Sequence, residues 1–171
     1  MRTLVTRRLV LEPQLAEHAE AMYALLQDPA IYRYENEPSH SVDGLRERFR
    51  RLESRASADG SEHWLNWVVR LRDAELTGYV QATVCEASPA AIAYVFASTW
   101  WGRGYATEAV AAMMEELVAN YGVRGFSAVL KRDNLRSVRL LERLGFAHAR
   151  PDAKIACDTD EIAMLRNSIA S

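Results

Sequence analysis

The chain has 171 residues, of which 49% are hydrophobic and 26% are charged, and its 21 Lys and Arg against 23 Asp and Glu give a formal net charge of −2. We expect residues 1–171 to form one domain, because domains usually span roughly 100–200 residues. The near-neutral charge argues against a general nucleic-acid-binding protein, which needs an excess of basic side chains to hold phosphates.

Membrane and secreted proteins are disfavoured as well. No apolar run approaches the roughly 20 residues of a membrane-spanning helix, so no membrane partner is expected. The first residues, MRTLVTRRLVLEP, alternate apolar and polar side chains and lack the apolar segment of a signal peptide. With only Cys85 and Cys157, a disulfide framework is not expected, and the cytoplasm is the expected location. Four scattered histidines predict no metal site.

The N-terminal third predicts one strand and two helices. Leu4–Leu11 alternates between apolar and polar residues, as a strand does, and Pro13 is expected to end it. A helix stopping at Asp28-Pro29 is indicated by an apolar stripe at helical spacing, formed by Leu15, Ala19, Met22, Tyr23 and Leu26. A loop is expected over residues 32–41. A second, arginine-rich helix has the stripe Val42, Leu45, Phe49 and Leu52, and residues 54–61 are typical of a connector.

The middle of the chain predicts a sheet. Three strands are expected at His63–Leu71, Leu76–Glu86 and Ala91–Ala97. In the first of them, alternate residues fall on opposite faces, with Trp67 and Val69 on one face and Val68 on the other. Both faces are largely apolar, so helices are expected to cover both sides of the sheet.

The C-terminal part alternates helices and strands. The strongest helix begins at Tyr105 and ends near Gly122. A last helix is expected with Asp133 as its cap and Gly145 as its end. Strands are expected at Phe126–Leu130, near Phe146 and at Glu161–Arg166. Strands followed by a β-α-β-α-β order predict an α/β (α+β) fold with a mixed sheet.

The turn TWWGRGYATE (Thr99–Glu108) between a strand and the strongest helix is the most informative segment. Its two glycines allow a sharp turn and close approach to a ligand, and the N–H groups at a helix start can bind phosphate. A dinucleotide-binding turn needs Gly or Ala where Thr107 stands, and a triphosphate loop needs a Gly-Lys-Ser/Thr that is absent. A coenzyme A pyrophosphate loop and an ordinary strand–helix turn both remain open.

Four stretches carry a family resemblance: TRRLVL (6–11), YVFASTWWGRGYATEA (94–109), NLRS (134–137) and LERLGF (141–146). They resemble the GNAT N-acetyltransferase superfamily, in particular its RimJ/RimL-like branch of ribosomal-protein N-terminal acetyltransferases. The resemblance implies a single GNAT domain over residues 1–171, with a mixed, strongly twisted sheet of about seven strands and helices on both faces. It also implies acetyl-CoA as acyl donor, no metal, an amine-bearing acceptor and, as in much of the branch, a homodimer.

The resemblance also implies how the cofactor is held. Backbone groups would bind the pantetheine arm along the strand and the pyrophosphate at the loop, through Val95, Phe96 and Ala97, and through Gly102, Arg103, Gly104, Tyr105 and Ala106. The Arg103 side chain either meets a phosphate or is solvated. Asn134 would contact the cofactor near its thioester, cap the following helix, or do both.

The implied reaction is direct attack of a neutral amine on the thioester. Many GNAT enzymes place a tyrosine seven residues after the asparagine to protonate the leaving thiolate, but that position is Leu141 here. The branch offers a serine instead, which makes Ser137, with Asn134, the candidate catalytic residue. The acidic residue of the branch's cofactor strand is replaced by Ala91. The remaining candidate bases, each also explained as a solvent-facing residue, are Glu35, Glu37, His63 and Glu86, and an α-amine can instead lose its proton to ordered water.

The acceptor is the least determined feature. Aromatic and acidic side chains that could form a pocket for a cationic amine are Tyr32, Tyr34, Glu35 and Trp64, although tryptophan in a strand is also typical of core packing. The favoured acceptor is the α-amine of a protein or peptide. The alternatives are a small-molecule amine, such as an antibiotic, an aminoacyl metabolite or an amino acid, and a non-catalytic acyl-CoA-binding or sensor protein.

Overall fold

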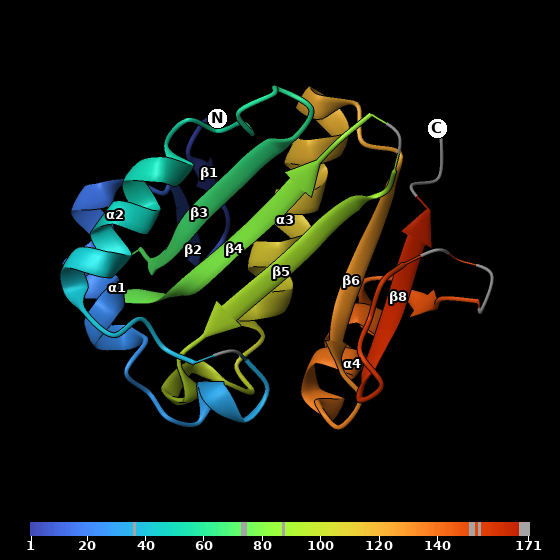
Figure 1. The fold of residues 1–171 in the computed structure, drawn as a ribbon. Helices are drawn as coiled ribbons and strands as arrows, with labels where there is room; N and C mark the ends of the chain where they lie inside the picture. Colours follow the sequence, from blue (N-terminus) through green and yellow to red (C-terminus); the bar gives the residue numbers. More distant parts are fainter. Residues whose placement is uncertain (36, 73–74, 87, 151–152, 154, 168–171) are drawn as a thin grey trace.

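The structure, a computed structural model, describes residues 1–35, 37–72, 75–86, 88–150, 153 and 155–167 (Figure 1). Its strands are β1 (Leu4–Val5), β2 (Leu9–Pro13), β3 (His63–Leu71), β4 (Leu76–Val84), β5 (Ala90–Phe96), β6 (Gly125–Lys131), β7 (Ala147–His148) and β8 (Glu161–Asn167). These eight strands form one sheet in the order β1-β2-β3-β4-β5-β6-β8-β7. Neighbouring strands run antiparallel, apart from the parallel pair β5 and β6. The predicted mixed sheet is therefore confirmed.

Helices cover both faces of this sheet. They are α1 (Ala19–Leu25), α2 (Val42–Leu52), α3 (Tyr105–Tyr121) and α4 (Leu135–Arg143), with short 3-10 turns η1 (Ala16–His18), η2 (Ile31–Arg33) and η3 (Ser98–Trp100). In Figure 1, α1 and α2 lie against one face of the sheet and α3 lies behind the other. None of the described helices is long and apolar enough to cross a membrane.

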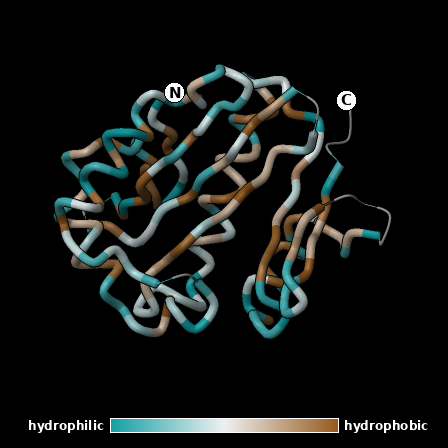
Figure 2. The backbone as a smooth tube through the Cα atoms, viewed as in Figure 1, coloured by the Kyte–Doolittle hydropathy of each residue, from teal (hydrophilic) through white to brown (hydrophobic). Residues whose placement is uncertain are grey.

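Two hydrophobic cores follow from the alternation of the strands. Trp67 and Val69 of β3 belong to the larger core with Met113 of α3, whereas Val68 between them packs with Met22 of α1. Hydrophobic residues follow one another along the central strands, whereas the residues of α2 are mostly hydrophilic, as its arginines predict (Figure 2). The assignment of β3 residues to two covered faces is thus confirmed.

The expected strand Leu4–Leu11 is wrong, because the chain turns back within it. β1 and β2 form a hairpin in which Leu4 pairs with Leu11. The Thr6 N–H donates to the Leu9 carbonyl (2.9 Å), and the Thr6 hydroxyl oxygen accepts from the Leu9 N–H (3.0 Å). Both arms alternate with the same period, so the periodicity does not reveal the turn.

One smaller expectation near the C-terminus also changes. The cap of α4 is Asn134 rather than Asp133, since the Asn134 side-chain oxygen accepts from the Ser137 N–H (3.3 Å). The last strand of the chain, β8, lies between β6 and β7 and is therefore not the edge strand of the sheet.

The parallel pair β5 and β6 separates soon after it begins. Only Ala90 and Ala91 of β5 pair with β6, opposite Phe126 and Ser127, and the two strands then diverge (Figure 1). On its other side β5 stays paired with β4 up to Phe96. In the described part of the chain, the later residues of β5 therefore have one edge without a partner strand, at the end of the sheet where α3 begins.

Candidate active site

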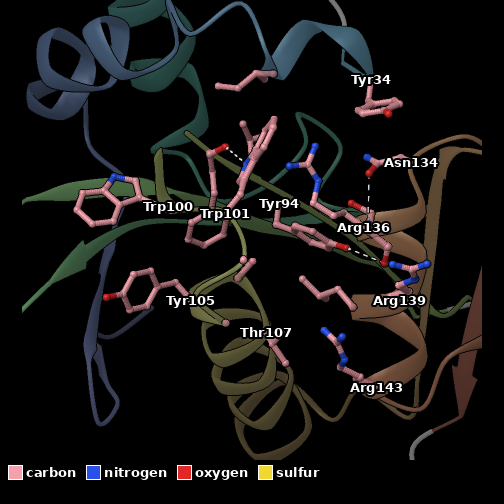
Figure 3. A pocket seen from close by; sticks show the side chains of 18 of the residues that line it. Tyr34, Tyr94, Trp100, Trp101, Tyr105, Thr107, Asn134, Arg136, Arg139 and Arg143 are labelled. Atoms are coloured by element: carbon pink, nitrogen blue, oxygen red, sulfur yellow. Dashed lines mark hydrogen bonds between the residues drawn. The ribbon is translucent and has the colours of Figure 1, made fainter. Parts of the chain in front are cut away.

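A cavity of about 360 Å³ lies where β5 and β6 separate (Figure 3). Its walls come from the loop around η2, the end of β5, the turn into α3 and one side of α4. A strand edge with free backbone groups and the start of a helix therefore face one space. Such a space can hold an extended, amide-containing molecule that carries phosphate groups.

The turn into α3 needs its two glycines. Gly102 and Gly104 have φ values of +74° and +78°, a conformation that other residues rarely adopt. Gly102, Gly104, Tyr105, Ala106 and Thr107 all line the cavity. The first N–H groups of α3 have no acceptor within the helix, so they and the helix dipole are available to an anion.

Two predicted cofactor residues lie outside the cavity lining. The Ala97 N–H donates to the Thr77 carbonyl (3.1 Å), which continues the pairing of β5 with β4. The guanidinium carbon of Arg103 lies 5.1 Å from the centre of the Trp100 ring. Val95 and Phe96, in contrast, line the cavity as the resemblance implies.

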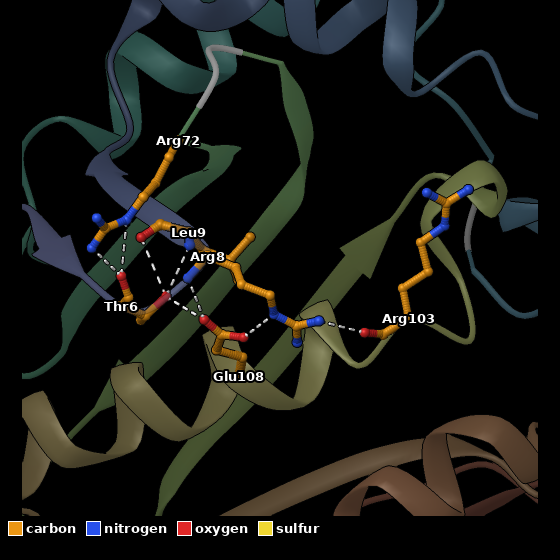
Figure 4. Close-up of polar contacts among 6 residues, drawn as sticks. All are labelled: Thr6, Arg8, Leu9, Arg72, Arg103 and Glu108. Carbon is orange, nitrogen blue, oxygen red and sulfur yellow. Dashed lines mark hydrogen bonds and ion pairs between the residues drawn. The ribbon is translucent and has the colours of Figure 1, made fainter.

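The N-terminal hairpin holds the turn in place (Figure 4). The Glu108 carboxylate accepts from the Thr6 hydroxyl (2.6 Å), the Arg8 backbone N–H (2.9 Å) and Arg8 Nε (2.6 Å). Arg8 Nη1 also donates to the Arg103 carbonyl (2.9 Å). Burial acts to raise the pKa of Glu108, but these hydrogen bonds outweigh it and the pKa is lowered. Two sequence stretches about 100 residues apart thus form one contact, which the sequence does not reveal.

On the strand side, Tyr94 and Trp101 make ordered contacts. Trp101 Nε1 donates to the Phe96 carbonyl (2.8 Å) and its ring stacks on Arg136, whose guanidinium carbon lies 3.5 Å from the ring centre. The Tyr94 hydroxyl donates to the Ser137 carbonyl (3.4 Å). Burial raises the pKa of Tyr94 to about 12, so the phenol stays a hydrogen-bond donor at neutral pH.

The helix α4 brings both candidate catalytic residues into the cavity. Asn134 and Ser137 line it, and the Ser137 side chain lies within hydrogen-bonding reach of the Tyr94 phenol. Arg136, Arg139 and Arg143 line the cavity as well. Sequence reasoning missed these arginines, although their spacing of three and four residues on the predicted helix places them on one face. They make this wall of the cavity cationic.

The four tentative acceptor residues separate into two pairs. Tyr34 and Glu35 line the cavity. The Tyr32 hydroxyl instead donates to the Leu26 carbonyl (2.5 Å). Trp64 donates to Glu62 (2.9 Å) and lies at the other end of the sheet, because it pairs with Thr83, which in turn pairs with Ala91 at the start of β5.

Other candidates from the sequence lie elsewhere. Glu37, His63 and Glu86 are not among the residues that line the cavity. Among the described residues, no group of three His, Cys, Asp or Glu side chains is arranged to hold a metal ion. The free thiol of Cys85 contacts the Ser88 hydroxyl (2.7 Å) on the turn before β5.

Comparisons with known proteins agree with this geometry. The family described as Acetyltransferase (GNAT) domain matches residues 8–147. The uncharacterized N-acetyltransferase p20 of Bacillus licheniformis is 27% identical over 149 residues, which cover 85% of this chain and 83% of p20. Among solved structures, RimL, a ribosomal L7/L12 alpha-N-protein acetyltransferase in complex with coenzyme A, has a TM-score of 0.80 at 18% identity, covering 96% of this chain and 97% of RimL. The microcin C7 self-immunity acetyltransferase MccE, in complex with acetyl-CoA and AMP, has a TM-score of 0.78 at 16% identity and covers 95% and 93%. The resemblance seen in the sequence is confirmed.

Proposed function

Since this chain belongs to the GNAT acetyltransferase family and is an acyltransferase, we propose that it moves the acetyl group of acetyl-CoA directly to the α-amine of a protein or peptide N-terminus. The observation that carries the proposal is a single cavity shared by the free edge of β5, the start of α3, and Asn134 and Ser137. RimL, which shares the fold, is an α-N-protein acetyltransferase bound to coenzyme A.

The cavity fits the parts of acetyl-CoA. The amides of the pantetheine arm pair with the free edge of β5 at Val95 and Phe96, as an added strand would. The pyrophosphate accepts hydrogen bonds from the backbone N–H groups at the start of α3, beside Gly102 and Gly104. Arg139 and Arg143, which have no ion-pair or hydrogen-bond partner among the described residues, supply positive charge to the phosphates.

The transfer needs few groups once both substrates are bound. The amine nitrogen attacks the thioester carbon, the C–N bond forms and the C–S bond breaks. The hydroxyl of Ser137 donates a hydrogen bond to the departing thiolate, which then takes a proton from solvent. Asn134 fixes the first turn of α4 through its bond to the Ser137 N–H, and thereby the position of that hydroxyl.

An α-amine is more often neutral than a lysine side chain and is therefore the better nucleophile at neutral pH. At pH 7 an amine with a pKa near 8 is roughly 10% neutral, whereas a lysine amine near 10.4 is about 0.04% neutral. A second candidate acceptor is a small-molecule amine, because MccE shares the fold and is bound to acetyl-CoA and AMP.

Release of coenzyme A thiol tests the acceptor. Purified protein is assayed with acetyl-CoA and peptides starting with Ser or Ala, with the same peptides blocked at the N-terminus but carrying an internal lysine, and with aminoglycosides and amino acids. We expect the highest kcat/KM with the free α-amines and background rates with the blocked peptides. Turnover with small amines alone would contradict the peptide acceptor and support the second candidate.

We also propose that residues 1–171 act as one domain. The family match ends at residue 147, but β8 lies beyond it and pairs with β6 over seven residues from Glu161 to Asn167. The C-terminal segment is thus part of the same sheet. The cytoplasmic location and the homodimer stay predictions from the sequence.

A further inference from the structure

One acidic side chain belongs to the cavity and has no role in holding the cofactor. Among the described residues that line it, Glu35 alone has a carboxylate, and it shares the cavity with Tyr94, Asn134 and Ser137. We propose that Glu35 is the general base that takes the proton from the acceptor amine during transfer. This inference rests on the proposed function and concerns the one step for which the sequence leaves several candidate residues open, since the acid of the strand is replaced by Ala91.

The loop that carries Glu35 is tied to the strand that faces the cofactor. The Asp28 carboxylate accepts from the Ser98 N–H (2.6 Å), two residues beyond the end of β5, and from the Ala30 N–H (3.0 Å). Ile31 in η2 is only 4% exposed, and the Tyr34 N–H donates to its carbonyl (3.2 Å). These contacts hold the start of the loop against the end of β5, directly before Glu35, which lines the cavity.

The Glu35 carboxylate has no partner of its own. It makes no hydrogen bond or ion pair with any described residue, and its side chain is exposed to the open cavity. The ionisable groups that share the cavity with it are the phenols of Tyr34 and Tyr94 and the guanidinium groups of α4. The latter belong to Arg136, Arg139 and Arg143. Asp28 and the phenol of Tyr32 lie on the same loop, and Tyr79 of β4 and Arg48 of α2 lie near them. A free carboxylate at this point can accept a proton from a bound amine.

Its surroundings make it a better base than an ordinary surface glutamate. Partial removal of water by the surrounding protein raises the pKa of Glu35 above its usual value, although the side chain still reaches solvent. Burial is the main reason why the pKa values of Tyr32, Tyr79 and Tyr94 are raised, and the negative charge of Glu35 raises them further. The carboxylate therefore lies close to all three phenols. General bases work best when their pKa approaches the working pH.

The proton balance of the step is closed. As the C–N bond forms and the C–S bond breaks, one N–H proton of the amine passes to the Glu35 carboxylate. The thiolate leaves with the hydrogen bond from Ser137 and takes a proton from solvent. The protonated Glu35 returns its proton to solvent before the next turnover.

The test compares Glu35→Gln with a matched control, Glu37→Gln, which changes an exposed carboxylate two residues along that does not line the cavity. For the best peptide acceptor at pH 7, we expect Glu35→Gln to lower kcat about 100-fold, in the range of general-base catalysis, with the KM for acetyl-CoA unchanged. Glu35→Asp is expected to recover part of the rate, and Glu37→Gln to keep all of it. Melting temperatures verify that the variants fold.

The pH profile separates proton transfer from simple binding of an ammonium ion. The wild-type rate is expected to fall as the pH drops through the pKa of Glu35, and the deficit of Glu35→Gln to persist above the pKa of the acceptor amine, where no ammonium ion remains to be bound but the attacking amine must still lose a proton. An unchanged kcat with a raised acceptor KM at every pH would overturn the base role. If the wild-type protein acetylates only small amines, the proposed acceptor fails instead, and the same variants are then compared on that amine.

Discussion

The two sides of the cavity are built from different parts of the chain. The side proposed for the cofactor uses a free strand edge, the start of α3 and arginines of α4, whereas the side proposed for the acceptor uses Tyr34 and Glu35 of one loop. Recognition by backbone groups requires particular residues at fixed spacing, such as Gly102 and Gly104, and therefore leaves a motif. Recognition by loop side chains leaves none. The sequence pattern is thus informative about the donor and nearly silent about the acceptor.

The strongest challenge to the cofactor side is Gly104→Val. A β-branched residue at φ +78° is strained, so the turn must shift, whereas the added Cβ itself would meet Arg8 Nη2 at an ordinary contact distance of 3.4 Å. We expect acetyl-CoA to bind about 100-fold more weakly by calorimetry. Gly60→Val is the matched control, because Gly60 has a similar φ of +73°, open space around it and no part in the cavity. Unchanged affinity in Gly104→Val would contradict the assignment of the turn.

The arginine wall is tested by the double variant Arg139→Ala/Arg143→Ala. Loss of two charged contacts is expected to weaken coenzyme A binding about 30-fold at low salt and less at high salt, since salt screens exposed charges. Arg124→Ala removes an exposed arginine that lies outside the cavity and serves as control. Equal affinities of the double variant and the control would place the phosphates elsewhere.

The Ser137→Ala variant tests whether the cofactor side and the acceptor side of the cavity meet at the thioester of acetyl-CoA. Because the serine hydroxyl is proposed to act on the departing thiolate, we expect kcat to fall about 10-fold while the Kd for coenzyme A changes little. Rapid-quench or steady-state assays at saturating acetyl-CoA measure the first quantity and calorimetry the second. Full activity would remove Ser137 from the mechanism.

The smallest effect on the site is expected for Glu108→Gln, which leaves the cavity lining intact. Loss of charge-assisted bonds to Thr6 and Arg8 is expected to lower the free energy of unfolding by about 1.5 kcal/mol and cofactor affinity only slightly. The pKa of Glu108 is lowered from 4.5 on folding, so its stabilising effect is present above 4.5 and is lost as the pH falls through the lower value of the folded chain.

Urea unfolding at pH 7 and in this acid range measures that contribution. The wild-type protein should lose more stability on acidification than Glu108→Gln, since the variant has no carboxylate to protonate. Glu115→Gln, at an exposed position of the same helix, is expected to behave like wild type. Identical acid profiles for all three proteins would contradict the role of Glu108.

Most of the fold could be predicted because alternation and helical spacing are local properties. Trp67, Val68 and Val69 predict a strand covered on both faces, and in the structure they pack into the two cores on opposite sides of the sheet. The insertion of β8 between β6 and β7 is a choice of neighbours that no local pattern records. The turn at Thr6 is hidden for a related reason, since both arms of the hairpin have the same period.

The site is harder to predict from the sequence than the fold, for physical reasons that differ from residue to residue. Gly102 and Gly104 have a conformational requirement that sequence reveals. Trp64 was a candidate for its chemistry, but strand register carries it to the far end of the sheet. Arg139 and Arg143 face the cavity only because α4 is placed beside the gap between β5 and β6, which is a property of the assembled sheet.

The hairpin at the start of the chain has a practical consequence for protein production. Arg2 pairs with the buried Glu116 (2.7 Å), and Arg8 with Glu108 (2.6 Å), two helical turns apart on α3. Trimming the chain to begin at residue 8, where the family match begins, would delete Arg2 and Thr6. The Glu116 carboxylate, in a residue only 5% exposed, would then lose its cation and keep only the hydrogen bond from Asn120 (2.9 Å). An expression plasmid designed on that boundary would therefore yield a less stable protein.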